Sequence, residues 1–184
     1  MMAFPTLRRP RTPPPAETVY ARLVEGARAP ALYRQLGVPD TLDGRFEMLV
    51  LHAVLFFRRL RGEDEAARRL GQEVFEAMFR DMDGSLREIG VGDLAVPKRI
   101  KGMIQAFYGR GAAYDAALDG GDAAALADAL ARNIYEGEVG DAAERLAAYV
   151  RAAEAGLAAQ SRETLTQSGP CFAGAAGAIE EVGE

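Results

Sequence analysis

Apolar residues recur every three or four positions from Ala16 onward, and this spacing limits the fold more than any other feature of the chain. It places apolar side chains on one face of an α-helix, whereas a half-buried β-strand needs strict alternation. Because alternating runs are missing, the sequence predicts an all-α fold. A length of 184 residues suits a single compact multi-helix domain.

One predicted helix, capped by Asp40 or Thr41 and continuing to about Leu60, is apolar nearly all round rather than on one face. A helix with this composition is normally surrounded by other helices. We therefore expect it to be the central helix of the core. The other expected helices span approximately residues 15–27, 30–36, 63–89, 97–118, 122–135 and 141–159.

The two ends of the chain lack this pattern. Residues 1–15 are rich in proline and arginine, and because proline cannot donate a backbone hydrogen bond, we expect a flexible N-terminal arm. Residues 160–184 are small, polar and weakly periodic, so we expect a disordered C-terminal tail. The predicted domain therefore spans residues 16–159.

The chain has one cysteine, Cys171, and one histidine, His52. A disulfide within the chain needs two cysteines, and a structural zinc site needs a cluster of cysteine and histidine ligands. No apolar run approaches the ~20 residues that cross a bilayer. We expect no metal ion and no cofactor, and a protein that is soluble or peripheral to a membrane.

An active site could be built only from His52, Asp81 and Asp83. His52 titrates near neutral pH but lies in the most apolar helix, where a structural bond to a neighbouring carbonyl is the favoured role. Two helical residues at i and i+2 point about 200° apart, so the aspartates can share an ion only if Gly84 unwinds the turn. An enzyme is the least favoured hypothesis, and we expect neither a catalytic residue nor a small-molecule substrate.

The net charge of −5 conceals a local excess of positive charge. Residues 94–114 contain Lys98, Arg99, Lys101 and Arg110 but no acid, whereas the chain outside this segment and the arm sums to −12. An acidic body argues against a general nucleic-acid binder, so we expect no DNA partner. A single basic segment still permits a local contact with an anionic partner.

The helix expected over residues 97–118 carries an ordinary core stripe and, on the roughly opposite side, a stripe of small residues. The small residues are Gly102, Ala106, Gly109 and Ala113. Lys98 lies on one edge of this stripe, and Arg99 and Arg110 lie on the other. Small residues allow close approach of another helix, including a transmembrane helix, and cations suit carboxylates, phosphates or lipid head groups. Alternatively, another helix of the domain fills this groove.

The run GVGDLAVPKRIKGMIQAFYGRGAAYDAAL, residues 90–118, resembles the signature stretch of the ubiquinol-cytochrome c chaperone family. These proteins are bacterial relatives of the mitochondrial cytochrome b assembly chaperone. Residues 32–60 and 72–90 also resemble the family in order and spacing. The resemblance implies a non-enzymatic assembly factor that binds newly synthesised cytochrome b and promotes assembly of ubiquinol-cytochrome c reductase, respiratory complex III.

The resemblance and the groove together give the expected partner-binding site. The polar contacts are expected from Lys98, Arg99, Lys101, Tyr108 and Arg110, and the floor of the groove from Gly102, Ala106, Gly109 and Ala113. Besides cytochrome b, the ribosome and an anionic membrane surface are possible partners. The chain lacks a convincing presequence, which fits a cytoplasmic protein peripheral to the inner face of the bacterial membrane.

An alternative function rests on the same basic segment. In this alternative, the protein is a helical module that binds RNA or the ribosome through residues 94–114. Such binding would depend steeply on salt concentration, because each phosphate that a protein neutralises releases counterions.

Overall fold

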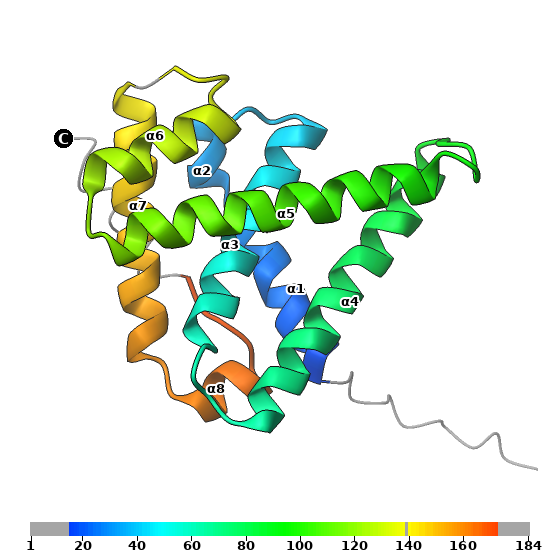
Figure 1. The fold of residues 1–184 in the computed structure, drawn as a ribbon, viewed down its shortest axis with the longest axis horizontal. Coiled ribbons are helices and arrows are strands. Elements are labelled where there is room, and N and C mark those ends of the chain that lie inside the picture. The colour runs from blue at the N-terminus through cyan, green and yellow to red at the C-terminus, as the bar shows by residue number, and fades with distance from the viewer. Residues whose placement is uncertain (1–14, 139, 173–184) are drawn as a thin grey trace, which may run out of the picture.

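The computed structural model describes residues 15–138 and 140–172, which form helices joined by short loops (Figure 1). No residue in these ranges belongs to a β-strand, so the predicted all-α fold is confirmed. The rest of the expected arm, residues 1–14, and the end of the expected tail, residues 173–184, lie outside the described residues. The helices are α1 (Pro15–Ala27), α2 (Pro30–Arg34), α3 (Leu42–Arg59), α4 (Glu65–Glu88), α5 (Val96–Asp119), α6 (Ala123–Ile134), α7 (Asp141–Ala159) and α8 (Arg162–Gln167).

Helix α3 is the centre of the fold, as the sequence predicts. It packs against α1, α5, α6 and α7, and ten of its residues are buried. Thr41 begins the helix, because its Oγ1 accepts a hydrogen bond from the backbone N–H of Gly44 at 3.1 Å. Gly44 is required at this point, since a Cβ there would lie 2.0 Å from the carbonyl oxygen of Pro39.

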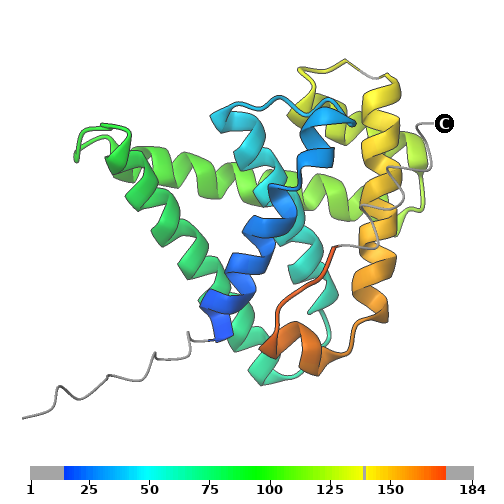
Figure 2. The same ribbon diagram turned by 180° about the vertical axis from the view of Figure 1, so that it is seen from behind.

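Helices α4 and α5 form a V whose apex is the turn between them (Figures 1 and 2). Each has 24 residues, whereas α3 has 18. Away from the apex the two helices diverge, and α1 and α3 pack between and behind them. The V therefore projects from the body of the protein.

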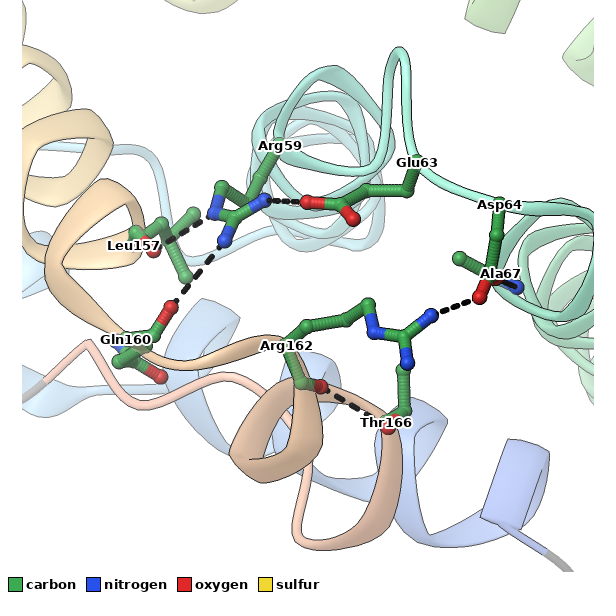
Figure 3. Close-up of polar contacts among 8 residues, drawn as sticks. All are labelled: Arg59, Glu63, Asp64, Ala67, Leu157, Gln160, Arg162 and Thr166. Carbon is green, nitrogen blue, oxygen red and sulfur yellow. Dashed lines mark hydrogen bonds and ion pairs between the residues drawn. The ribbon is translucent and has the colours of Figure 1, made fainter.

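The segment after α7 is folded onto the body, which corrects the expectation of a disordered tail from residue 160. In Figure 3, Arg162 of α8 forms an ion pair with Asp64, the residue that caps α4. Arg59 of α3 donates to the backbone oxygens of Leu157 at 3.2 Å and Gln160 at 3.3 Å. These contacts join the end of α7 to the turn between α3 and α4.

Phe172 completes this attachment. Its side chain is buried, and its ring centroid lies 4.6 Å from that of His52. The side chain of Gln160 donates to the carbonyl of Cys171 at 2.7 Å and accepts from its N–H at 2.9 Å. The folded domain thus extends to Phe172 rather than ending at Ala159.

His52 is fully buried in α3 and has two hydrogen-bond partners. Its Nδ1 lies 2.7 Å from the carbonyl oxygen of Met48, so Nδ1 must donate. Its Nε2 lies 2.7 Å from Oη of Tyr149 and then accepts. The predicted structural bond to a neighbouring carbonyl is confirmed. Burial lowers the pKa of His52 to about 4.

This pKa predicts an acid-sensitive fold. Because the ordinary pKa of histidine is about 6.5, the unfolded chain binds more protons than the folded one between pH 6.5 and 4. The contribution of neutral His52 to stability is complete above pH 6.5 and falls by about 3 kcal/mol as the pH decreases to 4. Urea unfolding at a series of pH values should show a shallower dependence for His52→Gln than for the wild type. Identical pH dependence of the two proteins would contradict this assignment.

Candidate partner-binding site

A groove of about 860 Å³ lies between α1, α3, α4 and α5, and the end of α6 also borders it. We call it the main groove. Apolar side chains from each of these helices line it: Val24, Leu42, Phe46, Met82, Leu86, Ile89, Met103 and Ile134. Two of them are unusually exposed for their size, Leu42 at 63% and Ile89 at 60%. Val24, Phe46 and Met103 are partly exposed, whereas Met82, Leu86 and Ile134 are buried. The exposed apolar surface of the main groove therefore comes mainly from Leu42 and Ile89.

Arginines are frequent around the main groove. Five line it, namely Arg28, Arg45, Arg99, Arg110 and Arg132, against four acids, Asp43, Glu47, Asp81 and Glu136. Arg45 pairs with Asp40 at 2.7 Å, and Arg110 pairs with Glu47. The other three arginines form no ion pair with the residues that the structure describes. They leave positive charge available at the groove.

Arg110 and Glu47 form a largely buried ion pair between α5 and α3. Both nitrogens of one guanidinium edge donate to the two carboxylate oxygens of Glu47, which is 6% exposed. The guanidinium carbon also lies 6.0 Å from the ring centroid of Phe46. Burial raises the pKa of Glu47, although the hydrogen bond from Arg110 opposes this rise. The expected polar contact Arg110 is thus held by the protein itself, in the wall of the main groove.

The structure divides the stripe of small residues. Gly102 and Ala106 line the main groove, whereas Gly109 and Ala113 are not part of its lining. Ala113 is partly buried against the core, and Gly109 is exposed. A Cβ at Gly102 or at Gly109 would meet no heavy atom within 4 Å, so both positions have room for a side chain. Arg110, one position after Gly109, still lines the groove, so Gly109 lies to one side of the groove-facing surface of α5. Ala113 lies one turn farther along, where α5 packs on α6 (Figure 1).

The other predicted residues are divided between the main groove and other faces of α5. Arg99 lines the main groove, while Lys98 and Lys101 are exposed outside its lining. Tyr108, 62% exposed, borders a second pocket of about 410 Å³. Its ring centroid lies 5.9 Å from that of Phe75 and 5.7 Å from that of Phe107. The structure therefore does not bring Tyr108, Lys98 and Lys101 to the groove that holds Gly102.

The sequence does not reveal the walls of the main groove that α1, α3, α4 and α6 supply. In the sequence, the wall residues look like ordinary members of helical apolar stripes; they include Val24, Leu42, Leu86 and Ile134. Nothing in their local spacing separates a groove residue from a core residue, because only the packing of distant helices decides which of them is covered.

The residues considered for catalysis are engaged separately. Asp81 accepts a hydrogen bond from Oη of Tyr20 at 2.7 Å, and Asp83 pairs with Arg87 at 2.6 Å. Helix α4 continues through Gly84, so the two aspartates stay on different sides of it. His52 is bonded within the core. Among residues 15–138 and 140–172, no group of three His, Cys, Asp or Glu side chains could hold a metal ion, and no helix is long and apolar enough to cross a membrane.

Comparisons with known proteins place this architecture among assembly factors. A family model described as ubiquinol-cytochrome C chaperone matches residues 34–172. The ubiquinol-cytochrome-c reductase complex assembly factor 1 of Xenopus laevis is 25% identical over 135 residues, which cover 72% of this chain and 67% of that protein. The crystal structure of the Cbp3 homolog from Brucella abortus superposes with a TM-score of 0.77 at 44% identity, covering 85% of this chain and 88% of the other.

The ion pair between Arg110 and Glu47 predicts a specific loss of stability. In Arg110→Gln, the carboxylate of Glu47 stays buried without its cation, so the free energy of unfolding at pH 7 should fall by about 3 kcal/mol, at the low end for a buried pair because the Arg110 side chain is 23% exposed. The loss should shrink toward pH 4, because Glu47 then takes up a proton. Denaturant unfolding at both pH values measures this difference.

Arg99→Gln is the matched control, because Arg99 is exposed and has no described ion-pair partner; we expect a change within about 0.5 kcal/mol. Equal stability of Arg110→Gln and the wild type at pH 7 would show that the pair does not hold α5 on α3.

Proposed function

The chain belongs to the ubiquinol-cytochrome c chaperone family, and from this premise we propose that it binds newly synthesised cytochrome b and promotes its assembly into respiratory complex III. The family consists of chaperones and assembly factors for this complex. Cytochrome b as the client comes from the family resemblance. The observation that carries the proposal for this chain is the main groove, an exposed apolar surface bordered by arginines.

The size and lining of the main groove suit an apolar helical segment. A helix about 10 Å wide that rises 1.5 Å per residue fills the groove's 860 Å³ with about two turns. Gly102 and Ala106 have no large side chain, so such a helix can approach the backbone of α5 closely. Leu42 and Ile89 would lose their contact with water on binding, which favours the complex.

The arginines of the groove suit the polar ends of such a client segment. Arg28, Arg99 and Arg132 border the apolar lining and could bind carboxylates or phosphates where a membrane helix meets water. Arg110 contributes indirectly, since it holds the groove wall through Glu47.

We further propose that the protein is not an enzyme and uses neither a cofactor nor a small-molecule substrate. The chemistry of a holding chaperone needs only reversible burial of apolar surface. Its place would be the inner face of the bacterial cytoplasmic membrane, where newly inserted cytochrome b is within reach. The ribosome is a further possible partner of Lys98 and Lys101, which lie outside the groove lining.

Two leucine substitutions on the same helix test the groove. In Gly102→Leu the new side chain enters the main groove, so the amount of cytochrome b that co-purifies with the protein should fall at least tenfold. Gly109→Leu is the matched control, since the position is equally open but lies outside the groove lining, and it should retain the client. Both variants should unfold at or above the wild-type temperature, because leucine stabilises a helix by about 0.8 kcal/mol relative to glycine.

Undiminished co-purification with folded Gly102→Leu would contradict a client site in the main groove. Equal loss in both variants would move the site to another face of α5 and would also contradict the proposal. Ala106→Leu gives an independent check from the same floor.

A further inference from the structure

The apex of the V presents aliphatic side chains to water. Leu94 is 98% exposed and Ile89 60% exposed, and Val91 between them is partly exposed. We call these three residues the apolar tip. It lies at the end of α5 farthest from α6 and α7 (Figure 1). No described residue covers Leu94, so its full apolar area is available to a partner.

The turn that carries the tip is an ordered structure. The N–H of Val91 donates to the carbonyl of Leu86 at 3.0 Å, and the N–H of Ala95 donates to that of Gly92 at 2.8 Å. Gly90 has a φ of +88°, which a residue with a side chain rarely adopts. These constraints hold Leu94 outward before any partner binds, so docking costs little loss of conformational freedom.

Three cations follow the tip within the first two turns of α5. Lys98, Arg99 and Lys101 are exposed and form no ion pair with described residues; we call them the cationic collar. Two acids lie nearby, Glu88 and Asp93, and Asp93 pairs with Arg87. Residues 87–101 therefore carry a net charge of +2 on a protein whose total is −5.

We propose that the apolar tip and the cationic collar are the surface by which this protein docks on an anionic phospholipid bilayer. Leu94 and Ile89 enter the boundary between head groups and acyl chains, and the collar contacts the lipid phosphates. This deepens the proposed location at the membrane and rests on it for its biological setting. The association of aliphatic side chains with flanking cations is typical of peripheral membrane surfaces.

The exposed leucine favours a bilayer over RNA as the partner. Both would attract the collar, but an aliphatic side chain gains nothing from a phosphate backbone, and RNA-binding surfaces use aromatic residues for stacking. The apolar tip has no aromatic residue. A bilayer offers an apolar medium directly beneath its anionic surface.

Docking through the tip would also orient the main groove. Ile89 and Arg99 belong both to the docking surface and to the groove lining. One edge of the groove would then lie next to the bilayer surface, where the end of a membrane helix is accessible.

Vesicle flotation with the full-length protein tests this inference. Wild-type protein should float with vesicles of phosphatidylcholine plus phosphatidylglycerol and much less with phosphatidylcholine alone. Leu94→Ser should weaken partitioning about tenfold, which corresponds to partial burial of one leucine. A triple variant should weaken partitioning on the order of a hundredfold; it combines Lys98→Gln, Arg99→Gln and Lys101→Gln.

Tyr108→Ser is the control, because Tyr108 is an exposed side chain on α5 that lies outside both the apolar tip and the main groove; it should float like the wild type. Absence of wild-type flotation, or equal flotation of the wild type and Leu94→Ser, would overturn the inference. A third outcome would assign the cationic collar to RNA and also overturn the inference. In that case the protein would bind an RNA hairpin but not vesicles at the same salt concentration, and Leu94→Ser would leave the RNA binding unchanged. Client binding by the leucine variants of α5 is measured separately, so the chaperone proposal can stand if vesicle binding fails.

Discussion

The burial of the middle of α3, residues 50–56, on every side is the constraint on which the rest of the structure depends. Because this helix is apolar nearly all round, it is stable only when α1, α5, α6 and α7 surround it. With 18 residues it is ~27 Å long, whereas α4 and α5 with 24 residues reach ~36 Å. Their ends therefore extend beyond the helix that organises them. The apolar tip is a consequence of this difference in length, whereas the first turns of α3 form one wall of the main groove.

Polar residues on α3 fix the position of the surrounding helices. Glu47 is buried at the start of α3 and holds α5 through Arg110, while His52 connects α3 to α7 through Tyr149 and contacts Phe172. Each of these groups would be costly to bury alone, so each specifies one partner on one neighbouring helix. The wall of the groove and the attachment of the C-terminal segment thus depend on the same central helix.

Local patterns in the sequence were enough to predict the all-α fold, the central helix and the start of that helix at Asp40 or Thr41, because spacing and capping act within a few residues. The small-residue stripe on α5 was only partly informative. A helical wheel puts Gly102 and Gly109 on one broad face, but only Gly102 lines the groove, while Arg110 rather than Gly109 continues the lining along α5. The folded segment 160–172 could not be predicted, since it depends on contacts such as Arg162 with Asp64, which are 98 positions apart. The walls of the groove were missed for the same reason.

The central claim is that this chain acts on cytochrome b through the main groove. The most direct measurement is the reduced-minus-oxidised haem b spectrum of membranes from a strain that lacks the gene, complemented with wild type, Gly102→Leu or Gly109→Leu. We expect the deletion strain to lose the cytochrome b signal, wild type and Gly109→Leu to restore it, and Gly102→Leu to fail. A normal signal in the deletion strain, or full restoration by Gly102→Leu, would contradict the account.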